Sequence, residues 1–138
     1  MTTTIAPGLT LGPSDEATKA REQGYHLVSV HEAPPDDAPK ADAWVPILID
    51  VQTEDGVEER ASPRMLDEAA DAIAKAIKRG QRVFLYCGSS SERAPLVAAW
   101  YLWRSGQATT LDGAYDVVLE KRPGTRRRDS WILWDEPG

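Results

Sequence analysis

An amphipathic stretch between two short apolar runs constrains the fold of this chain more than any other feature of its sequence. Apolar side chains recur there at the spacing of one helix face, at Leu66, Ala69, Ala70, Ile73 and Ile77. Ser62 followed by Pro63 is a typical helix start, and Gly80 is a typical helix end. The flanking runs, residues 44–51 and 83–86, are rich in β-branched and aromatic residues, which is typical of buried strands. A strand, a helix and a strand in this order predict two parallel strands with the helix packed across them.

The rest of the sequence continues this alternation. Strands are predicted over residues 8–12, 26–30, 44–51 and 83–86. Helices are predicted over residues 15–23, 63–79, 96–104 and 111–122. Ser14 is the expected N-cap of the first helix, and Thr110 or Asp112 that of the last, while residues 33–39 and 52–60 are expected loops. We therefore expect an α/β fold with a central, mostly parallel sheet flanked by helices.

The length and charge of the chain limit its function. At 138 residues and 15.2 kDa it has the size of one compact domain, residues 1–138. The net charge of −6 argues against a dedicated nucleic-acid-binding protein. Residues 1–74 hold 15 acidic and 5 basic side chains, whereas residues 75–138 hold 7 acidic and 11 basic ones. An anionic ligand is therefore expected to bind the C-terminal half.

The sequence also indicates the setting in which the protein acts. No apolar run approaches the about 18 residues of a membrane span, and the N-terminus lacks the pattern of a secretory signal. We therefore expect a cytoplasmic protein that does not bind membranes. A single cysteine cannot form an internal disulfide or a cysteine-based zinc site, and two histidines are too few for a metal site. No metal or cofactor is predicted, and any special role of Cys87 must come from its own reactivity.

Cys87 directly follows the predicted strand at residues 83–86 and precedes a short Gly/Ser loop and a helix start. Backbone N–H groups that converge in such a loop, together with the positive end of the next helix, bind a phosphate-sized dianion. The same field favours the thiolate, which is the nucleophilic form of cysteine. Arg93 carries a planar guanidinium able to hold two phosphate oxygens. The alternative interpretation is a small buried cysteine at a strand end beside a solvated arginine.

The pattern from Cys87 to Arg93 resembles the active-site loop of dual-specificity-type cysteine phosphatases, in the protein tyrosine phosphatase superfamily. The similarity runs over roughly residues 5–123 and includes the later helix, which ends in Lys-Arg-Pro. It implies a phosphotyrosine-phosphatase-like fold, with Cys87 as the nucleophile and Arg93 binding the phosphoryl group. The implied phosphate-binding loop consists of Gly88, Ser89, Ser90, Ser91, Glu92 and Arg93. The implied reaction is hydrolysis of a phosphomonoester, in a phosphorylated protein or a small molecule, without metal or cofactor.

This mechanism needs a carboxylic acid that protonates the leaving alcohol and then activates water. The family places an aspartate for this task on a loop upstream of the cysteine. Asp55 lies 32 positions before Cys87 and Asp50 lies 37 positions before it. The spacing favours Asp55, with Asp50 as the rival and Glu54 as a weaker third choice. For each of them, a solvated loop carboxylate is the alternative interpretation.

Three residues depart from the usual family pattern, namely Tyr86, Ser90 and Ala94. The family usually has His before the cysteine, Gly at the third loop position and Ser or Thr after the arginine. Ser90 must adopt a backbone conformation that glycine takes more easily, and Ala94 lacks the hydroxyl that stabilises the leaving thiolate. A second hypothesis is therefore a phosphatase-like module that binds phosphorylated ligands with slow or negligible turnover.

The loop pattern Cys-x-x-Ser-Ser-Glu-Arg-x-Pro is also similar to the active-site loop of rhodanese-fold cell-cycle phosphatases. Residues 49–51 faintly resemble the rhodanese strand that carries an aspartate. A phosphatase or sulfurtransferase on that fold is the third hypothesis. Against it, the interval from Asp50 to Cys87 is short for a rhodanese, and residues 111–122 predict a helix where rhodaneses have a strand.

Other side chains have less specific interpretations. The arginines at residues 126–128 either recruit an acidic phosphorylated partner or form an exposed basic segment. Trp100 and Trp103 are expected in the core. Trp131 and Trp134 are expected to pack a C-terminal helical turn onto the domain or to form an apolar patch. The two histidines are assigned no role.

Overall fold

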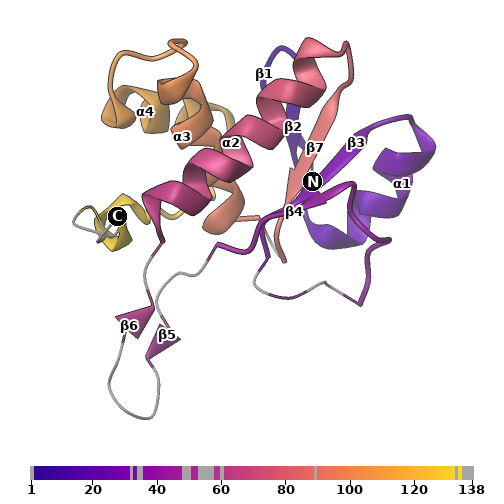
Figure 1. Ribbon diagram of the computed structural model, residues 1–138, viewed down its shortest axis with the longest axis horizontal. Coiled ribbons are helices and arrows are strands. Elements are labelled where there is room, and N and C mark those ends of the chain that lie inside the picture. The colour runs from indigo at the N-terminus through magenta and orange to yellow at the C-terminus, as the bar shows by residue number, and fades with distance from the viewer. Residues whose placement is uncertain are drawn as a thin grey trace.

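The sheet at the centre of the molecule has five strands in the order β1-β2-β7-β3-β4 (Figure 1). The computed structural model describes residues 2–31, 33, 36–47, 51–52, 58–59, 61–88, 90–132 and 134. The strands of the sheet are β1 (Thr3–Ala6), β2 (Leu9–Leu11), β3 (His26–Ser29), β4 (Ala43–Trp44) and β7 (Val83–Tyr86). β2, β7, β3 and β4 run parallel, and β1 is antiparallel to β2. The expected α/β fold with a mostly parallel sheet is confirmed.

Helices lie on both faces of this sheet (Figure 1). They are α1 (Ala17–Glu22), α2 (Pro63–Lys78), α3 (Arg93–Arg104) and α4 (Leu111–Lys121), with the 3₁₀ turns η1 (Ser14–Glu16) and η2 (Asp129–Trp131). α2, α3 and α4 cover one face and enclose a large apolar core, and α1 covers the other face over a smaller one. Among the described residues, no helix is both long and apolar enough to cross a membrane.

β7 is the central strand and lies between β2 and β3. Its four residues are at most 1% exposed, as the prediction of a buried strand requires. Val83 and Leu85 belong to the large core and Phe84 and Tyr86 to the core under α1, because side chains of a strand alternate between its faces. The carboxyl ends of the parallel strands meet at one edge of the sheet. Cys87 follows β7 at this edge.

The predicted helix over residues 63–79 is α2. Ser62 Oγ accepts a hydrogen bond from the backbone N–H of Met65 at 3.4 Å, and Pro63 lies in the first turn, where its missing N–H has no consequence. Gly80 follows the helix with a φ of +82°, a left-handed conformation that glycine adopts at low cost. The predicted start, buried face and end of this helix are all confirmed.

The structure decides which residue caps α4, and it shows that the expected cap before α1 does not form. Thr110 Oγ1 accepts a hydrogen bond from the N–H of Gly113 at 2.9 Å, so Thr110 rather than Asp112 is the N-cap of α4. Ser14 is not a cap, because it is itself the first residue of η1 and no side-chain cap bond forms there. Its backbone N–H instead donates to the carbonyl of Gly88 at 2.9 Å. The start of this helical segment is therefore tied to the loop after β7.

The expectation of a central strand over residues 44–51, covered on both faces, is wrong. β4 contains Ala43 and Trp44 only, and it lies at the edge of the sheet, where Trp44 is 49% exposed. Pairing with β3 continues a little further, because the N–H groups of Val45 and Ile47 donate to the carbonyls of Ser29 and Val30 at 2.9 and 3.2 Å, on either side of Pro46, which has no N–H. Val45 and Ile47 are buried without belonging to a strand. Backbone pairing at the sheet edge and burial of the alternate side chains Val45 and Ile47 together account for the described part of this apolar run.

Two further elements differ from the sequence expectations. The predicted loop over residues 52–60 overlaps a second sheet of two antiparallel strands, β5 (Val51–Gln52) and β6 (Glu58–Glu59). β1 was not expected as a separate strand, since the first predicted strand began at residue 8. It pairs with β2 through a turn at Gly8, whose φ is +82°. Both pairs depend on contacts between two segments, which single-segment periodicity does not show.

Trp134 in the C-terminal segment packs against the tryptophans of α3, whereas the side chain of Trp131 lies outside the described part of the structure. Trp100 is 2% exposed, and its Nε1 donates to Oδ1 of Asp67 at 2.8 Å. The ring of Trp134 lies 5.6 Å from that of Trp100 and 6.3 Å from that of Trp103, centroid to centroid. The expectation that Trp134 packs the C-terminal segment onto the domain is therefore confirmed, although this ring stays half exposed.

Candidate active site

Cys87 lies at the junction of β7 and the loop of residues 88–92, and its side chain is 3% exposed. α3 begins at Arg93, two residues before Pro95, so the loop leads directly into a helix of 12 residues. Glu92 is the residue before the helix, and its side chain forms no cap hydrogen bond. The positive end of α3 therefore faces the loop without a side-chain cap from Glu92.

Ser90 gives the loop its shape. It is fully buried and has a φ of 58°, the left-handed conformation that glycine would take more easily. Its hydroxyl accepts a hydrogen bond from the N–H of Cys87 at 3.0 Å and donates one to the carbonyl of Gly12. The serine side chain thus ties the two ends of a tight turn to β2. A glycine could adopt the same φ, but it could not form these bonds.

The carbonyl groups of the loop are held by residues outside it. Arg122 Nε donates to the carbonyl of Ser90 at 3.1 Å, and the N–H of Arg126 donates to the carbonyl of Ser91 at 2.7 Å. In a trans peptide the C=O and the next N–H point in opposite directions. The N–H groups of Ser91 and Glu92 therefore point away from Arg122 and Arg126. This orientation is the one that an anion-binding loop needs.

The carboxylate of Glu92 is neutralised by the segment that follows α4. Arg128 donates to Oε1 of Glu92 at 2.7 Å, and Arg126 lies 3.9 Å from the same oxygen. Arg127 pairs with Asp112 and Asp129 instead. Arg127 and Arg128 are therefore engaged in close ion pairs, whereas the side chain of Arg126 stays 75% exposed. Arg126 and Arg128 remove the charge that would most oppose an anion in the loop.

Arg93 is the first residue of α3, and its Nε donates to the carbonyl of Ile47 at 3.0 Å. This bond joins α3 to the segment that precedes the predicted general acids. Asp50, Glu54, Asp55 and the loop residue Ser89 lie outside the described residues. The choice between Asp55 and Asp50 therefore stays a prediction, as does the contact of Arg93 with a phosphoryl group.

Sequence analysis missed two residues beside the loop. Arg122 bonds to the loop carbonyl of Ser90 and to Oγ1 of Thr3 at 2.8 Å. Burial lowers the pKa of the Arg122 guanidinium. His31 packs against the loop, because its Nε2 is 3.7 Å from where a Cβ on Gly88 would lie. The signal available in the sequence for His31 was its place after β3, at the same edge of the sheet as Cys87.

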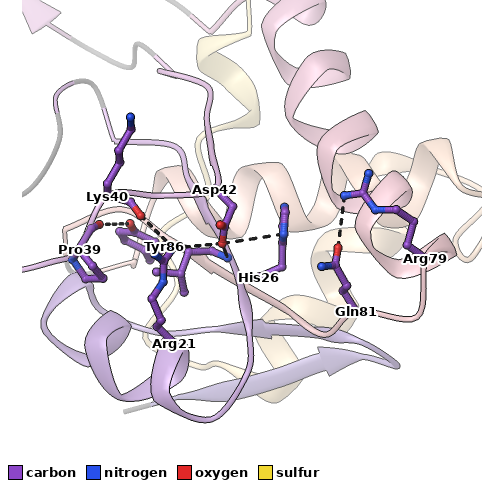
Figure 2. A network of polar contacts seen from close by, with 9 residues as sticks. Arg21, His26, Pro39, Lys40, Asp42, Arg79, Gln81 and Tyr86 are labelled. Carbon is purple, nitrogen blue, oxygen red and sulfur yellow. Dashed lines mark hydrogen bonds and ion pairs between the residues drawn. The ribbon is translucent and has the colours of Figure 1, made fainter.

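Tyr86 and Ala94, the two other departures from the expected pattern, are both buried. The phenol of Tyr86 lies in the core under α1 and its hydroxyl donates to the carbonyl of Pro39 at 3.5 Å (Figure 2). Burial raises the pKa of Tyr86, so this phenol stays neutral. It therefore belongs to the opposite side of β7 from the large core that α3 covers.

A central parallel strand that ends in a buried cysteine, followed by a tight loop and a helix, defines the class of the fold. The chain has the fold of the dual-specificity phosphatases in the protein tyrosine phosphatase superfamily. No protein-family model and no curated protein matches it. The rhodanese alternative is wrong, since residues 111–121 form the helix α4 rather than a strand.

Solved structures specify the likeness. The crystal structure of human DUSP28 is 25% identical, covering 94% of this chain and 86% of that chain with a TM-score of 0.72. A mouse putative dual specificity phosphatase, complexed with zinc tungstate, is also 25% identical, covering 94% and 80% with a TM-score of 0.72. The human tyrosine phosphatase-like serine/threonine/tyrosine-interacting protein is 17% identical, covering 94% and 89% with the same TM-score.

Proposed function

We propose that this protein hydrolyses phosphomonoesters through a cysteinyl-phosphate intermediate. The observation that carries this proposal is the placement of Cys87, which follows the central strand and precedes a loop whose carbonyls are held outward and a helix with its positive end toward the loop. Such a field favours a thiolate and binds a dianion next to it. The expected substrate is a phosphorylated protein or a small phosphomonoester.

The reaction proceeds in two displacements on phosphorus. The thiolate of Cys87 attacks the phosphorus atom, an S–P bond forms, and the P–O bond to the alcohol breaks. Asp55, or Asp50 as the alternative, gives its proton to the leaving oxygen. The same carboxylate then takes a proton from water, whose oxygen attacks phosphorus while the S–P bond breaks, and inorganic phosphate and the thiolate result. Arg93 and the loop N–H groups hold the non-bridging oxygens in both steps.

The direct test is hydrolysis of p-nitrophenyl phosphate. Wild type should release nitrophenol and be inhibited by vanadate, and Cys87→Ser should abolish turnover while phosphate still binds. Thr109→Ala, at an exposed position, is the matched control and should keep the wild-type rate. Equal rates in wild type and Cys87→Ser would refute the mechanism.

The identity of the general acid is tested separately. Asp55→Ala should lower kcat and leave vanadate inhibition unchanged, because the carboxyl acts on the leaving group and not on the bound phosphoryl oxygens. Asp50→Ala should then have a small effect. The reverse outcome would assign the acid to Asp50.

A second candidate function is capture of phosphorylated ligands with negligible turnover. Ala94 is fully buried and offers no hydroxyl to the departing thiolate, which favours a long-lived phosphocysteine. A relative by fold is itself named a phosphatase-like interacting protein. Mass spectrometry of the quenched reaction distinguishes the two functions, because only slow breakdown of the intermediate leaves phosphate on Cys87. Restoration of turnover in Ala94→Ser would identify the missing hydroxyl as the cause.

A further inference from the structure

The edge strand β1 is tied to the end of α4 and, through it, to the loop after β7. Arg122 Nη1 donates to Oγ1 of Thr3 at 2.8 Å, and Lys121 Nζ donates to the carbonyl of Ile5 at 3.0 Å. Arg122 Nε also donates to the carbonyl of Ser90 at 3.1 Å. One guanidinium therefore bonds at the same time to the N-terminal strand and to the loop.

These bonds belong to a closed ring of contacts around Ser90. Thr3 lies opposite Leu11 in the pairing of β1 with β2. Gly12 follows Leu11, and its carbonyl accepts a hydrogen bond from the hydroxyl of Ser90. The carbonyl of Ser90 accepts from Arg122, which returns to Thr3. Ser90 is thus held at its side chain from the end of β2 and at its carbonyl from β1, through Arg122.

The bond to Thr3 limits the positions that the Arg122 side chain can take. An arginine side chain loses much rotamer freedom when it is ordered, so a fixed acceptor is needed to keep it in one place. A planar guanidinium that is bonded at two nitrogens has a defined orientation. Thr3 is half-buried on a strand, and a β-branched side chain is stiff about its first torsion, so its Oγ1 is such an acceptor.

The Ser90–Ser91 peptide is the part of the loop that this arrangement orients. Its carbonyl points to Arg122, so its N–H, which belongs to Ser91, points the opposite way. A rotation of this peptide plane would turn that N–H away from a bound dianion and aim the carbonyl dipole at the dianion instead. The Arg122 bond at the carbonyl opposes this rotation.

We infer that Thr3 is a positioning residue for phosphate binding. It holds the Arg122 guanidinium where Nε keeps the Ser90 carbonyl outward and the Ser91 N–H available to the dianion. Thr3 acts through Arg122 and not by contact with the substrate. The inference rests on the proposed function, because it assumes that the loop after β7 binds the phosphoryl group.

The test compares three variants of β1. Thr3→Val keeps the shape of the side chain and removes the acceptor, whereas Thr3→Ser keeps the acceptor. Thr4→Val is the matched control, because the Thr4 hydroxyl bonds to Oγ1 of Thr10 at 3.2 Å and not to Arg122. Thr3→Val should raise the Kd for tungstate, a phosphate-sized dianion, about tenfold in calorimetry, as loss of one hydrogen bond to a charged group allows. Thr3→Ser and Thr4→Val should bind tungstate as wild type does.

Two further measurements separate positioning from a general loss of stability. Thr3→Val and Thr4→Val should have similar midpoints in urea, since each loses one hydroxyl bond of the same strand. Arg122→Lys keeps the charge but lacks the planar group with two donor nitrogens, so it should itself weaken tungstate binding. Thr3→Val should add nothing in the Arg122→Lys background. An additive effect there, or equal tungstate affinities of Thr3→Val and Thr4→Val, overturns the inference.

The same variants distinguish failure of the inference from failure of the proposed function. If wild type does not hydrolyse p-nitrophenyl phosphate but tungstate affinity falls in Thr3→Val alone, the function fails and the inference stands. If the ester is hydrolysed and Thr3→Val binds tungstate as wild type does, the function stands and the inference fails. If wild type binds no tungstate, the amide resonance of Ser91 decides: it should shift in Thr3→Val and not in Thr3→Ser, and an unchanged resonance overturns the inference.

Discussion

Replacement of Ser90 separates the two opposing effects that this residue has on the loop after Cys87. Its φ of 58° is strained for a residue with a side chain, whereas its hydroxyl joins the N–H of Cys87 to the carbonyl of Gly12. Ser90→Ala removes the hydroxyl and keeps the strain. Ser90→Gly removes both. The two variants therefore measure the hydroxyl and the backbone conformation independently.

The expected magnitudes follow from burial. Both partners of the Ser90 hydroxyl belong to buried residues, and each unsatisfied buried group costs about 1–3 kcal/mol. Ser90→Ala should therefore lower the free energy of unfolding by about 3 kcal/mol. Release of left-handed strain returns about 1–2 kcal/mol to Ser90→Gly, of which the larger freedom of glycine in the unfolded chain removes about 0.4–1 kcal/mol. Ser90→Gly should thus be less destabilised than Ser90→Ala by about 0.5–1 kcal/mol.

Urea unfolding followed by far-ultraviolet circular dichroism measures these differences, with unchanged m-values as evidence of a two-state comparison. Thr109→Ala, an exposed threonine outside the loop, should stay within about 0.5 kcal/mol of wild type. If Ser90→Ala also stays in that range, the hydroxyl bonds contribute nothing. If Ser90→Gly is the less stable of the two variants, the left-handed conformation is not the one adopted in solution.

Three other perturbations have defined outcomes. Gly12→Ala places a Cβ 2.6 Å from the nearest ring carbon of the phenylalanine in β7 and should cost about 1–3 kcal/mol in urea unfolding, whereas Gly124→Ala meets no atom within 4 Å and should be close to neutral. Burial raises the pKa of Tyr115, so at high pH the folded state keeps a proton that the unfolded chain loses. The stabilisation should be fully present below about pH 10 and should fall above it by about 1.4 kcal/mol per pH unit. Tyr115→Phe should reduce this dependence of the unfolding free energy on pH. Arg128→Ala leaves the carboxylate of Glu92 without its closest cation and should weaken vanadate inhibition about fivefold at low salt. The double variant Glu92→Gln/Arg128→Ala should recover the inhibition. Unchanged inhibition in Arg128→Ala would contradict the idea that Arg128 neutralises Glu92 for anion binding.

The parts of the site that are local in sequence were predictable. The apolar run of β7, the cysteine directly after it and the helix that begins at Arg93 are adjacent in the chain, and each follows from periodicity or from turn chemistry. The left-handed backbone conformation of Ser90 was also expected from the sequence, because it concerns the φ angle of one residue in the loop. The groups that hold the loop were not predictable in this way, since Gly12, Arg122 and Arg128 reach it from distant segments.

Long-range contacts also explain the errors in the fold. The apolar run that begins at Trp44 was assigned to a central strand, because an apolar run signals burial but not the neighbour that provides it. In the folded chain β4 lies at the edge of the sheet, and Val45 and Ile47 after it are buried and pair with the β3 segment on one side. His31 had no assigned role because its proximity to Gly88 exists only where two parallel strands end together.

The amino-acid sequence by itself determined the order of the four helices, the mostly parallel sheet and the place of the lone cysteine at the end of a buried strand. These depend on hydrophobic periodicity and backbone preferences, which act over a few residues. Only the tertiary structure decided what surrounds that cysteine: a serine that closes the loop, and arginines that hold its carbonyls and neutralise its glutamate. Hydrogen bonds and ion pairs between remote segments depend on the path of the whole chain, and no local pattern encodes them.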